Sequence, residues 1–259
     1  MQQSIIAEWY KIKNTPIIWL VILAGIITSI IVSAVYMINV IGVVELDVNP
    51  WESFLNISFA ANSIFIMLPF MILMITYICH LEIQSNGWKF LYTLPIKRAE
   101  IYLSKLFVIV LLFLIALGIY FFVAIASAYL VDFLYPEFEF RYYTPNLREF
   151  LENIFKLFLS LLGVIGFQYW LSLQSKNFIL PIGIGLVGFI IGFLIFASNS
   201  HYGQYFPFSF PMFIKKFKIV KDSGGSADTW YQVSGTISVL VFLGFTILGV
   251  FQNRKKDIK

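Results

Sequence analysis

Six apolar blocks, each about as long as a membrane-spanning helix, dominate this sequence of 259 residues. A helix rises 1.5 Å per residue, so roughly 20 apolar residues cross a hydrocarbon core about 30 Å thick. Only 12% of the residues are charged, against about 25% in an ordinary soluble domain. We therefore predict an all-α integral membrane protein with a single transmembrane domain over residues 1–259. Its six transmembrane helices are expected at residues 16–37, 57–79, 101–131, 151–173, 178–197 and 233–251.

The basic residues predict the orientation of this bundle, because the cytoplasmic flanks of membrane helices carry an excess of Lys and Arg. With six spans, both termini lie on one face. Eleven Lys and Arg residues flank that face and seven flank the other. The first loop of the opposite face, residues 39–56, contains Glu45, Asp47 and Glu52 but no basic residue. We expect both termini in the cytoplasm, and since the basic residues form no long run, no nucleic-acid partner.

The residues before the first span predict an amphipathic helix at the membrane surface. Ile5, Ile6, Trp9 and Ile12 recur at roughly helical spacing within residues 1–15. Such a pattern is typical of a helix lying in the membrane plane with its apolar face in the lipid. A plain cytoplasmic tail with accidental periodicity is the alternative.

Two of the spans contain residues that constrain their packing. Pro69 in the second span lacks a backbone N–H and is expected to distort the helix. Asn62 and Ser63 put polar groups at membrane depth, so they should face protein or water and not lipid. In the fifth span, Gly188 and Gly192 form a G-x-x-x-G motif, which is expected to let another helix approach closely.

The sequence contains few of the residue patterns that catalyse reactions or bind cofactors. It has no G-x-x-x-x-G-K-[ST] loop for nucleotide phosphates, and its two histidines, His80 and His201, accompany no hydrolase or zinc motif. The single Cys79 can form no internal disulfide. Ionisable residues are essentially absent from the span cores, which disfavours ion-driven transport. We expect no catalytic residue, no metal site and no cofactor bound by this chain.

The most informative stretch lies between the second and third spans and reads HLEIQSNGWKFLYTLPIKRAEIYLSK, residues 80–105. Asn86 and Gly87 favour a turn, residues 88–94 can form a short amphipathic helix, and Pro95 ends it. A short rigid element between two membrane helices can dock into a cleft of a soluble partner. An aromatic loop anchored among lipid headgroups is the alternative, and composition alone does not separate the two.

This stretch resembles a loop of ATP-binding-cassette type-2 permeases, especially those of bacteriocin and lantibiotic immunity exporters. In that loop an acidic residue precedes W-K-x-L-x-x-L-P-x-x-R, and a lysine follows. Glu8 and Lys11 are similar to the E-x-x-K pattern of the family's N-terminal segment. The resemblance implies that residues 80–100 form the loop that couples to a separate ATPase. The coupling residues expected on this basis are Glu82, Gly87, Trp88, Lys89, Leu91, Leu94, Pro95, Lys97, Arg98 and Lys105.

The resemblance also implies partners and a location. Two permease subunits pair as a homodimer or heterodimer in lipid of the bacterial cytoplasmic membrane, and each contacts a cytoplasmic ATPase that binds ATP and Mg. In the outer segment, residues 198–231, the run YFPFSFPMF is similar to the short re-entrant helices that the family has between its fifth and sixth spans.

The function expected is therefore that of a permease subunit of an ATP-driven exporter. Its substrate would be hydrophobic or amphipathic, such as an antimicrobial peptide or a lipid-like compound. The alternatives are an ATP-independent secondary carrier and a membrane scaffold that transports nothing. An intramembrane enzyme has almost no support from the residues present.

Overall fold

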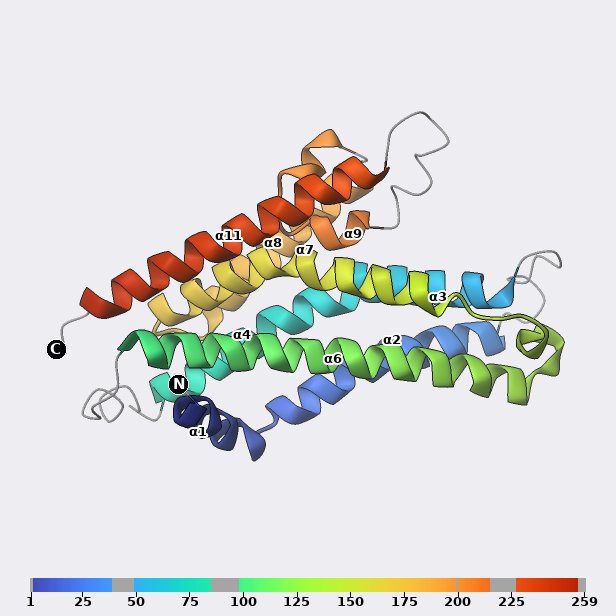
Figure 1. Ribbon diagram of the computed structural model, residues 1–259, viewed down its shortest axis with the longest axis horizontal. Helices are drawn as coiled ribbons and strands as arrows, with labels where there is room; N and C mark the ends of the chain where they lie inside the picture. Colours follow the sequence, from blue (N-terminus) through green and yellow to red (C-terminus); the bar gives the residue numbers. More distant parts are fainter. Residues whose placement is uncertain (1, 39–48, 85–97, 199, 215–226, 256–259) are drawn as a thin grey trace.

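The computed structural model describes residues 2–38, 49–84, 98–198, 200–214 and 227–255, and within these ranges the chain is helical, without strands. The helices form an elongated bundle in which α1 and the last turns of α11 lie at the same end (Figure 1). The elements are α1 (Gln2–Lys13), α2 (Ile17–Ile38), α3 (Pro50–Ala61), η1 (Asn62–Ile66), α4 (Met67–Gln84), α6 (Arg98–Leu134), η2 (Pro136–Phe138), η3 (Phe140–Tyr142), α7 (Leu147–Gln174), α8 (Ile179–Ala197), η4 (His201–Gln204), α9 (Phe210–Phe213) and α11 (Ala227–Lys255).

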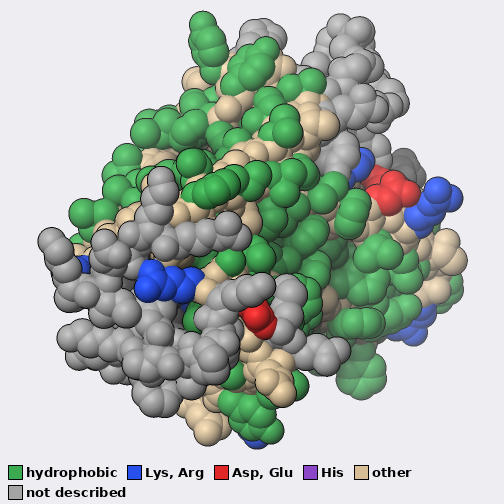
Figure 2. All heavy atoms as spheres, turned by 60° about the vertical axis from the view of Figure 1, so that its left-hand side comes forward, with side chains coloured by type: hydrophobic (Ala, Val, Ile, Leu, Met, Phe, Trp, Pro, Cys, Tyr) green, Lys and Arg blue, Asp and Glu red, His purple; other side chains and the backbone are tan. Residues whose placement is uncertain are grey.

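The six predicted spans are confirmed as helices that are long and apolar enough to cross a membrane. Hydrophobic side chains cover most of the described surface in Figure 2, and charged side chains occupy only a few places there. That is the surface expected of a protein whose surroundings are lipid. The six candidate spans are Ile17–Ile38, Pro50–Leu81, Arg98–Leu134, Leu147–Gln174, Ile179–Ala197 and Val233–Asn253.

The second span begins at Pro50, so the start predicted at Ile57 is wrong. The side chain of Asn49 accepts a hydrogen bond from the backbone N–H of Trp51 at 3.0 Å and caps the helix. Pro50 suits the first helical turn, where its missing N–H has no helical partner to lose. The span predicted from the apolar block began too late because the charged Glu52 interrupts the apolar sequence. An acidic residue is nevertheless favourable near a helix N-terminus.

The distortion expected near Pro69 is present as a π-helical turn, η1, which ends three residues before the proline. A proline ring crowds the carbonyl four residues earlier, and a π turn relieves such crowding by lengthening the hydrogen-bonded loop. Here the N–H of Met67 donates to the carbonyl of Asn62, five residues back. Asn62 and Ser63 are both buried, which confirms that they face protein.

Two pairs of spans make the most extensive contacts in the bundle, α2 along α6 and α11 along α7. At Gly25 of α2, an added Cβ would lie 2.6 Å from the side chain of Ile119 on α6. Between α7 and α11, the hydroxyl of Ser238 donates to the carbonyl of Ser160 at 2.9 Å and accepts from the N–H of Gly163 at 2.8 Å. A side chain on α11 therefore bonds directly to the backbone of α7.

The G-x-x-x-G motif of α8 is a close-packing site, as predicted, but its neighbour is a turn and not a helix. An added Cβ would lie 2.8 Å from the ring of Phe208 at Gly188 and 2.8 Å from the carbonyl oxygen of Phe208 at Gly192. The turn leads into the short helix α9, whose residues are buried and which contacts α7, α8 and η1. Insertion of this segment into a membrane stays a prediction.

One end of the bundle extends well beyond α8, α9 and α11 (Figure 1). The helix α6 has 37 residues, or about 55 Å, whereas a hydrocarbon core is only about 30 Å thick. Its far end, together with α3, η2 and η3, forms a projection that we call the α3 end. There the indole N–H of Trp51 donates to the carbonyl of Phe140 at 2.9 Å, within a cluster of aromatic rings that includes Tyr36, Phe54 and Phe138.

Candidate functional site

The predicted coupling segment begins and ends at the same end of the bundle as α1, which we call the α1 end (Figure 1). Helix α4 ends at Gln84 and α6 begins at Arg98. Glu82 lies in the last turn of α4, in a part whose side chains are not described. The remaining predicted coupling residues outside the described ranges are Gly87, Trp88, Lys89, Leu91, Leu94, Pro95 and Lys97.

Lys105, the last of the predicted coupling residues, is buried beneath α1. Its Nζ lies 3.1 Å from Oε2 of Glu8, and the two side chains are only 2% and 4% exposed. Lys11 pairs with the other oxygen of the same carboxylate, Oε1. Transferring a charge out of water costs several kcal/mol unless an opposite charge compensates it. The pair therefore fixes the position of α1 on α6, and Lys105 is buried between these helices, while its expected part in coupling stays a prediction.

One face of α1 makes this contact with both polar and apolar side chains. Ser4, Glu8 and Ile12 recur every four residues and are all buried, and the hydroxyl of Ser4 donates to Oε1 of Glu100 at 3.2 Å. The apolar residues Ile6 and Trp9 are 55% and 36% exposed. Of the four residues of the predicted apolar face, Ile6 and Trp9 point outward, whereas Ile12 is buried on the protein side and Ile5 is half-buried against the core. The expected position of α1 in the membrane plane stays a prediction.

The first turns of α6 also contact α7 and α11. The carbonyl of Tyr102 accepts a hydrogen bond from the hydroxyl of Tyr169 at 3.0 Å, and their ring centroids are 4.7 Å apart. On the other side of Tyr102, an added Cβ at Gly249 would lie 2.1 Å from its hydroxyl oxygen. The first turns of α6 therefore contact three helices: α1 through Glu8, α7 through Tyr169 and α11 through Gly249. A shift of α6 at this end would have to move all three helices.

Neutral polar side chains inside the bundle are hydrogen-bonded across the helices. Gln168 donates to the hydroxyl of Thr76 and to the carbonyl of Pro181, both at 3.0 Å, and so joins α7 to α4 and α8. On the other side of the bundle, Ser58 and the hydroxyl of Tyr120 are 3.1 Å apart. Among the described residues, no group of three or more His, Cys, Asp or Glu side chains could hold a metal ion. This arrangement suits helix packing.

The comparison with known protein families decides the identity of the chain. Residues 4–192, well over half of its length, match the family described as ABC-2 family transporter protein. The chain belongs to this family. Its members are membrane transport components and are not themselves catalytic. A search of curated proteins gave no significant match.

The region of this ABC-2 transporter protein that matches the family includes nearly all of α1 and the segment between α4 and α6. It begins at Ser4, whose hydroxyl contacts Glu100, and it includes the whole of the predicted coupling segment. The sequence resemblance identified Glu8, Lys11 and Lys105 separately, but did not predict that the three side chains meet. The only sequence signal for that meeting was the pair Glu8 and Lys11 on a helix that ends next to a membrane span.

Proposed function

We propose that this protein is the permease subunit of an ABC exporter, driven by ATP that a separate cytoplasmic subunit hydrolyses. The observation that carries the proposal is the family match over residues 4–192, which includes α1 and the segment between α4 and α6. The partners are an ATPase that binds ATP and Mg, and a second permease subunit of the same or a related sequence. Both termini lie in the cytoplasm of a bacterial cell, next to the ATPase.

The geometry supports a role for α6 as the helix that transmits movement. It begins where the coupling segment ends and continues to the α3 end, so one continuous helix joins the two ends of the bundle. The Glu8–Lys105 pair makes α1 move with it, and the Tyr102–Tyr169 contact does the same for α7. A displacement of Arg98 by the ATPase would therefore reach several spans together.

The substrate that we propose is hydrophobic or amphipathic, either an antimicrobial peptide or a lipid-like compound. The resemblance to immunity exporters supports this class. The spans themselves offer polar hydroxyl and amide groups and no buried charge at their centre, which suits a cargo that enters from the membrane. Under this proposal, export would protect the cell from a compound that accumulates in its own bilayer.

The test is to reconstitute the chain in lipid with its ABC ATPase, sought first among the products of adjacent genes, and to measure ATP hydrolysis. We expect binding and stimulated hydrolysis from the natural sequence. Trp88→Ala and Pro95→Ala should remove most of the stimulation while the protein still inserts and folds, because both residues shape the docking segment. Trp19→Ala is a matched control, since Trp19 is 69% exposed on α2 and lies outside residues 80–100.

Two results would overturn the proposal. One is the absence of any binding or stimulation by the natural sequence. The other is transport that proceeds without the ATPase and follows an imposed ion gradient, which would establish a secondary carrier. If transport needs the ATPase but both coupling variants behave like the control, the exporter stands and the coupling segment is misassigned.

A further inference from the structure

We propose that Tyr102 is a positioning residue that couples α6 to α11, and that its hydroxyl group bonds to the side chain of Asn253 only when α6 is displaced. The inference rests on the proposed exporter function, because the ATPase supplies the displacement. Tyr102 lies in the first turns of α6, just after the coupling segment, and is only 1% exposed. The last turns of α11 lie at the same end of the bundle (Figure 1).

The hydroxyl group of Tyr102 is the observation that carries this inference. It is buried, and it makes no hydrogen bond to any residue that the structure describes. Buried polar groups in proteins are nearly always hydrogen-bonded, since leaving one unsatisfied is costly, and a native exception calls for an explanation. Phenylalanine would fill the same space without that cost. A tyrosine at this position is explained if its hydroxyl group bonds in another arrangement of the helices.

Gly249 of α11 sets the resting position of this hydroxyl group. An added Cβ at Gly249 would lie 2.1 Å from the hydroxyl oxygen of Tyr102, so only glycine leaves room for it. This contact is one of shape, without a hydrogen bond from the hydroxyl. By contrast, the Glu8–Lys105 ion pair holds α1 on α6, and a hydrogen bond from Tyr169 holds α7. A displacement of α6 would therefore change its contact with α11 more easily than the other two.

Asn253 is the partner that the geometry offers after a displacement. It lies four residues after Gly249, so the two share one face of α11, and it is only 6% exposed. Because α11 ends where α6 begins, Asn253 lies beyond Gly249 in the direction of the coupling segment. Side chains in a helix lean toward its N-terminus, which for Tyr102 is the same direction. The amide oxygen of Asn253 can accept a hydrogen bond from the tyrosine O–H.

A displacement of α6 toward the ATPase would move the hydroxyl group from Gly249 to the next turn of α11. The two positions are about 6 Å apart along the helix axis, and rotation of the Tyr102 side chain can supply part of that distance. Because the hydroxyl fills the space at Gly249, the movement pushes α11 aside. Closely packed helices change between such discrete arrangements and do not deform continuously. The bond to Asn253 would then stabilise the displaced arrangement.

The resting contact is tested by thermal unfolding of the purified full-length chain in detergent. Tyr102→Phe should keep or raise the Tm, since the hydroxyl makes no bond at rest, whereas Tyr169→Phe removes a bond and should lower it. Gly249→Ala should also lower the Tm by overpacking. Gly244→Ala is its control on the same helix, because an added Cβ there has nothing within 4 Å. A Tm loss in Tyr102→Phe as large as in Tyr169→Phe, or equal Tm values for the two glycine variants, would overturn the proposal.

The displaced contact is tested in lipid with the ABC ATPase, by the ATP hydrolysis that the permease stimulates. Tyr102→Phe and Asn253→Leu should each lower kcat about fivefold and leave the KM for ATP unchanged, because the lost hydrogen bond is far from the nucleotide. The double variant should be no worse than either single variant, since both remove the same bond. Tyr202→Phe is the control, because Tyr202 is 76% exposed in η4, and it should change neither constant.

The outcomes separate this inference from the proposed function. If the natural sequence stimulates hydrolysis and Tyr102→Phe does so equally well, the exporter stands and the positioning role of Tyr102 is wrong. An additive loss of about 25-fold in the double variant would also exclude the bond between the two side chains. If the natural sequence stimulates no ATPase, the exporter function fails and the positioning role fails with it.

Discussion

The two ends of the bundle are held together by different physical means. At the α1 end, the buried ion pair between Glu8 and Lys105 connects α1 to α6. At the α3 end, aromatic rings pack edge to face and one indole N–H of Trp51 bonds to the carbonyl of Phe140. A buried ion pair depends on both partners, whereas a ring cluster spreads its stabilisation over many contacts. The α1 end should therefore tolerate substitution least, which suits a region that transmits movement.

The largest effect is expected from Glu8→Gln, because it removes the carboxylate that compensates the buried Lys105. Breaking a buried ion pair on one side costs about 3–5 kcal/mol. Lys105→Met should cost less, since Glu8 keeps its contact with Lys11. Thermal unfolding of the purified protein in detergent would measure both changes.

The double variant Glu8→Gln/Lys105→Met provides the control for that experiment. It should recover much of the stability lost in Glu8→Gln, because it leaves no buried charge from this pair. Lys11→Met should have a smaller effect, since the Lys11 side chain is 39% exposed. If Lys11→Met were as harmful as Glu8→Gln, the comparison between the two ends would be wrong.

An intermediate effect is expected where α8 meets the turn at Phe208. Gly192→Ala places a methyl group 2.8 Å from a backbone carbonyl oxygen, which cannot rotate away as a side chain can. Overpacking of this kind costs about 1–3 kcal/mol. Gly183→Ala is the matched control in the same helix, because an added Cβ there has nothing within 4 Å. Equal Tm values for the two variants would show that the turn is not packed against α8.

The smallest effect is expected at the α3 end from Trp51→Phe. The substitution keeps an aromatic ring but removes the hydrogen bond to Phe140, which costs about 1 kcal/mol. Arg148→Met at the same end should change the free energy of unfolding by less than about 0.5 kcal/mol. Arg148 and its partner Glu152 are both exposed, and exposed ion pairs contribute little. A loss at Trp51 as large as that of Glu8→Gln would mean that both ends depend on single contacts.

Much of the fold could be predicted because membrane spans are local features. The length of an apolar block and the thickness of the bilayer suffice, and all six spans were found in this way. The errors lie at the ends of the helices. The start at Pro50 was missed since the polar residue Glu52 follows it, although Asn49 and Pro50 together are a helix-start signal.

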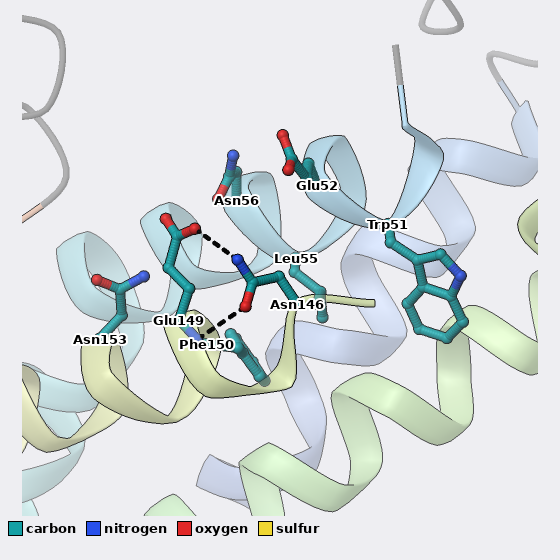
Figure 3. Close-up of a pocket in the computed structure, with 8 residues that line it drawn as sticks. All are labelled: Trp51, Glu52, Leu55, Asn56, Asn146, Glu149, Phe150 and Asn153. Atoms are coloured by element: carbon teal, nitrogen blue, oxygen red, sulfur yellow. Dashed lines mark hydrogen bonds between the residues drawn. The ribbon is translucent and has the colours of Figure 1, made fainter. Parts of the chain in front are cut away.

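The candidate sites were less predictable because they depend on which residues meet. Of the predicted coupling residues, only Arg98 and Lys105 have side chains within the described part of the chain, and the roles of the whole set stay predictions. The pocket between α3 and α7 at the α3 end was not predicted at all (Figure 3). Asn153 and Glu52, which both line it, lie far apart in the sequence, and neither belongs to a motif.

The sequence by itself determined that the chain is a six-span membrane protein, and it supplied the resemblance that the family match confirms. Only the tertiary structure decided that Glu8 faces Lys105 and that the hydroxyl group of Tyr102 lies against Gly249. The reason is physical: hydropathy and helical periodicity act within one segment, whereas the partner of a buried polar group depends on how segments pack. In α1 the apolar residues Ile6 and Trp9 are exposed while the polar Ser4 and Glu8 are buried, an arrangement that periodicity alone cannot assign.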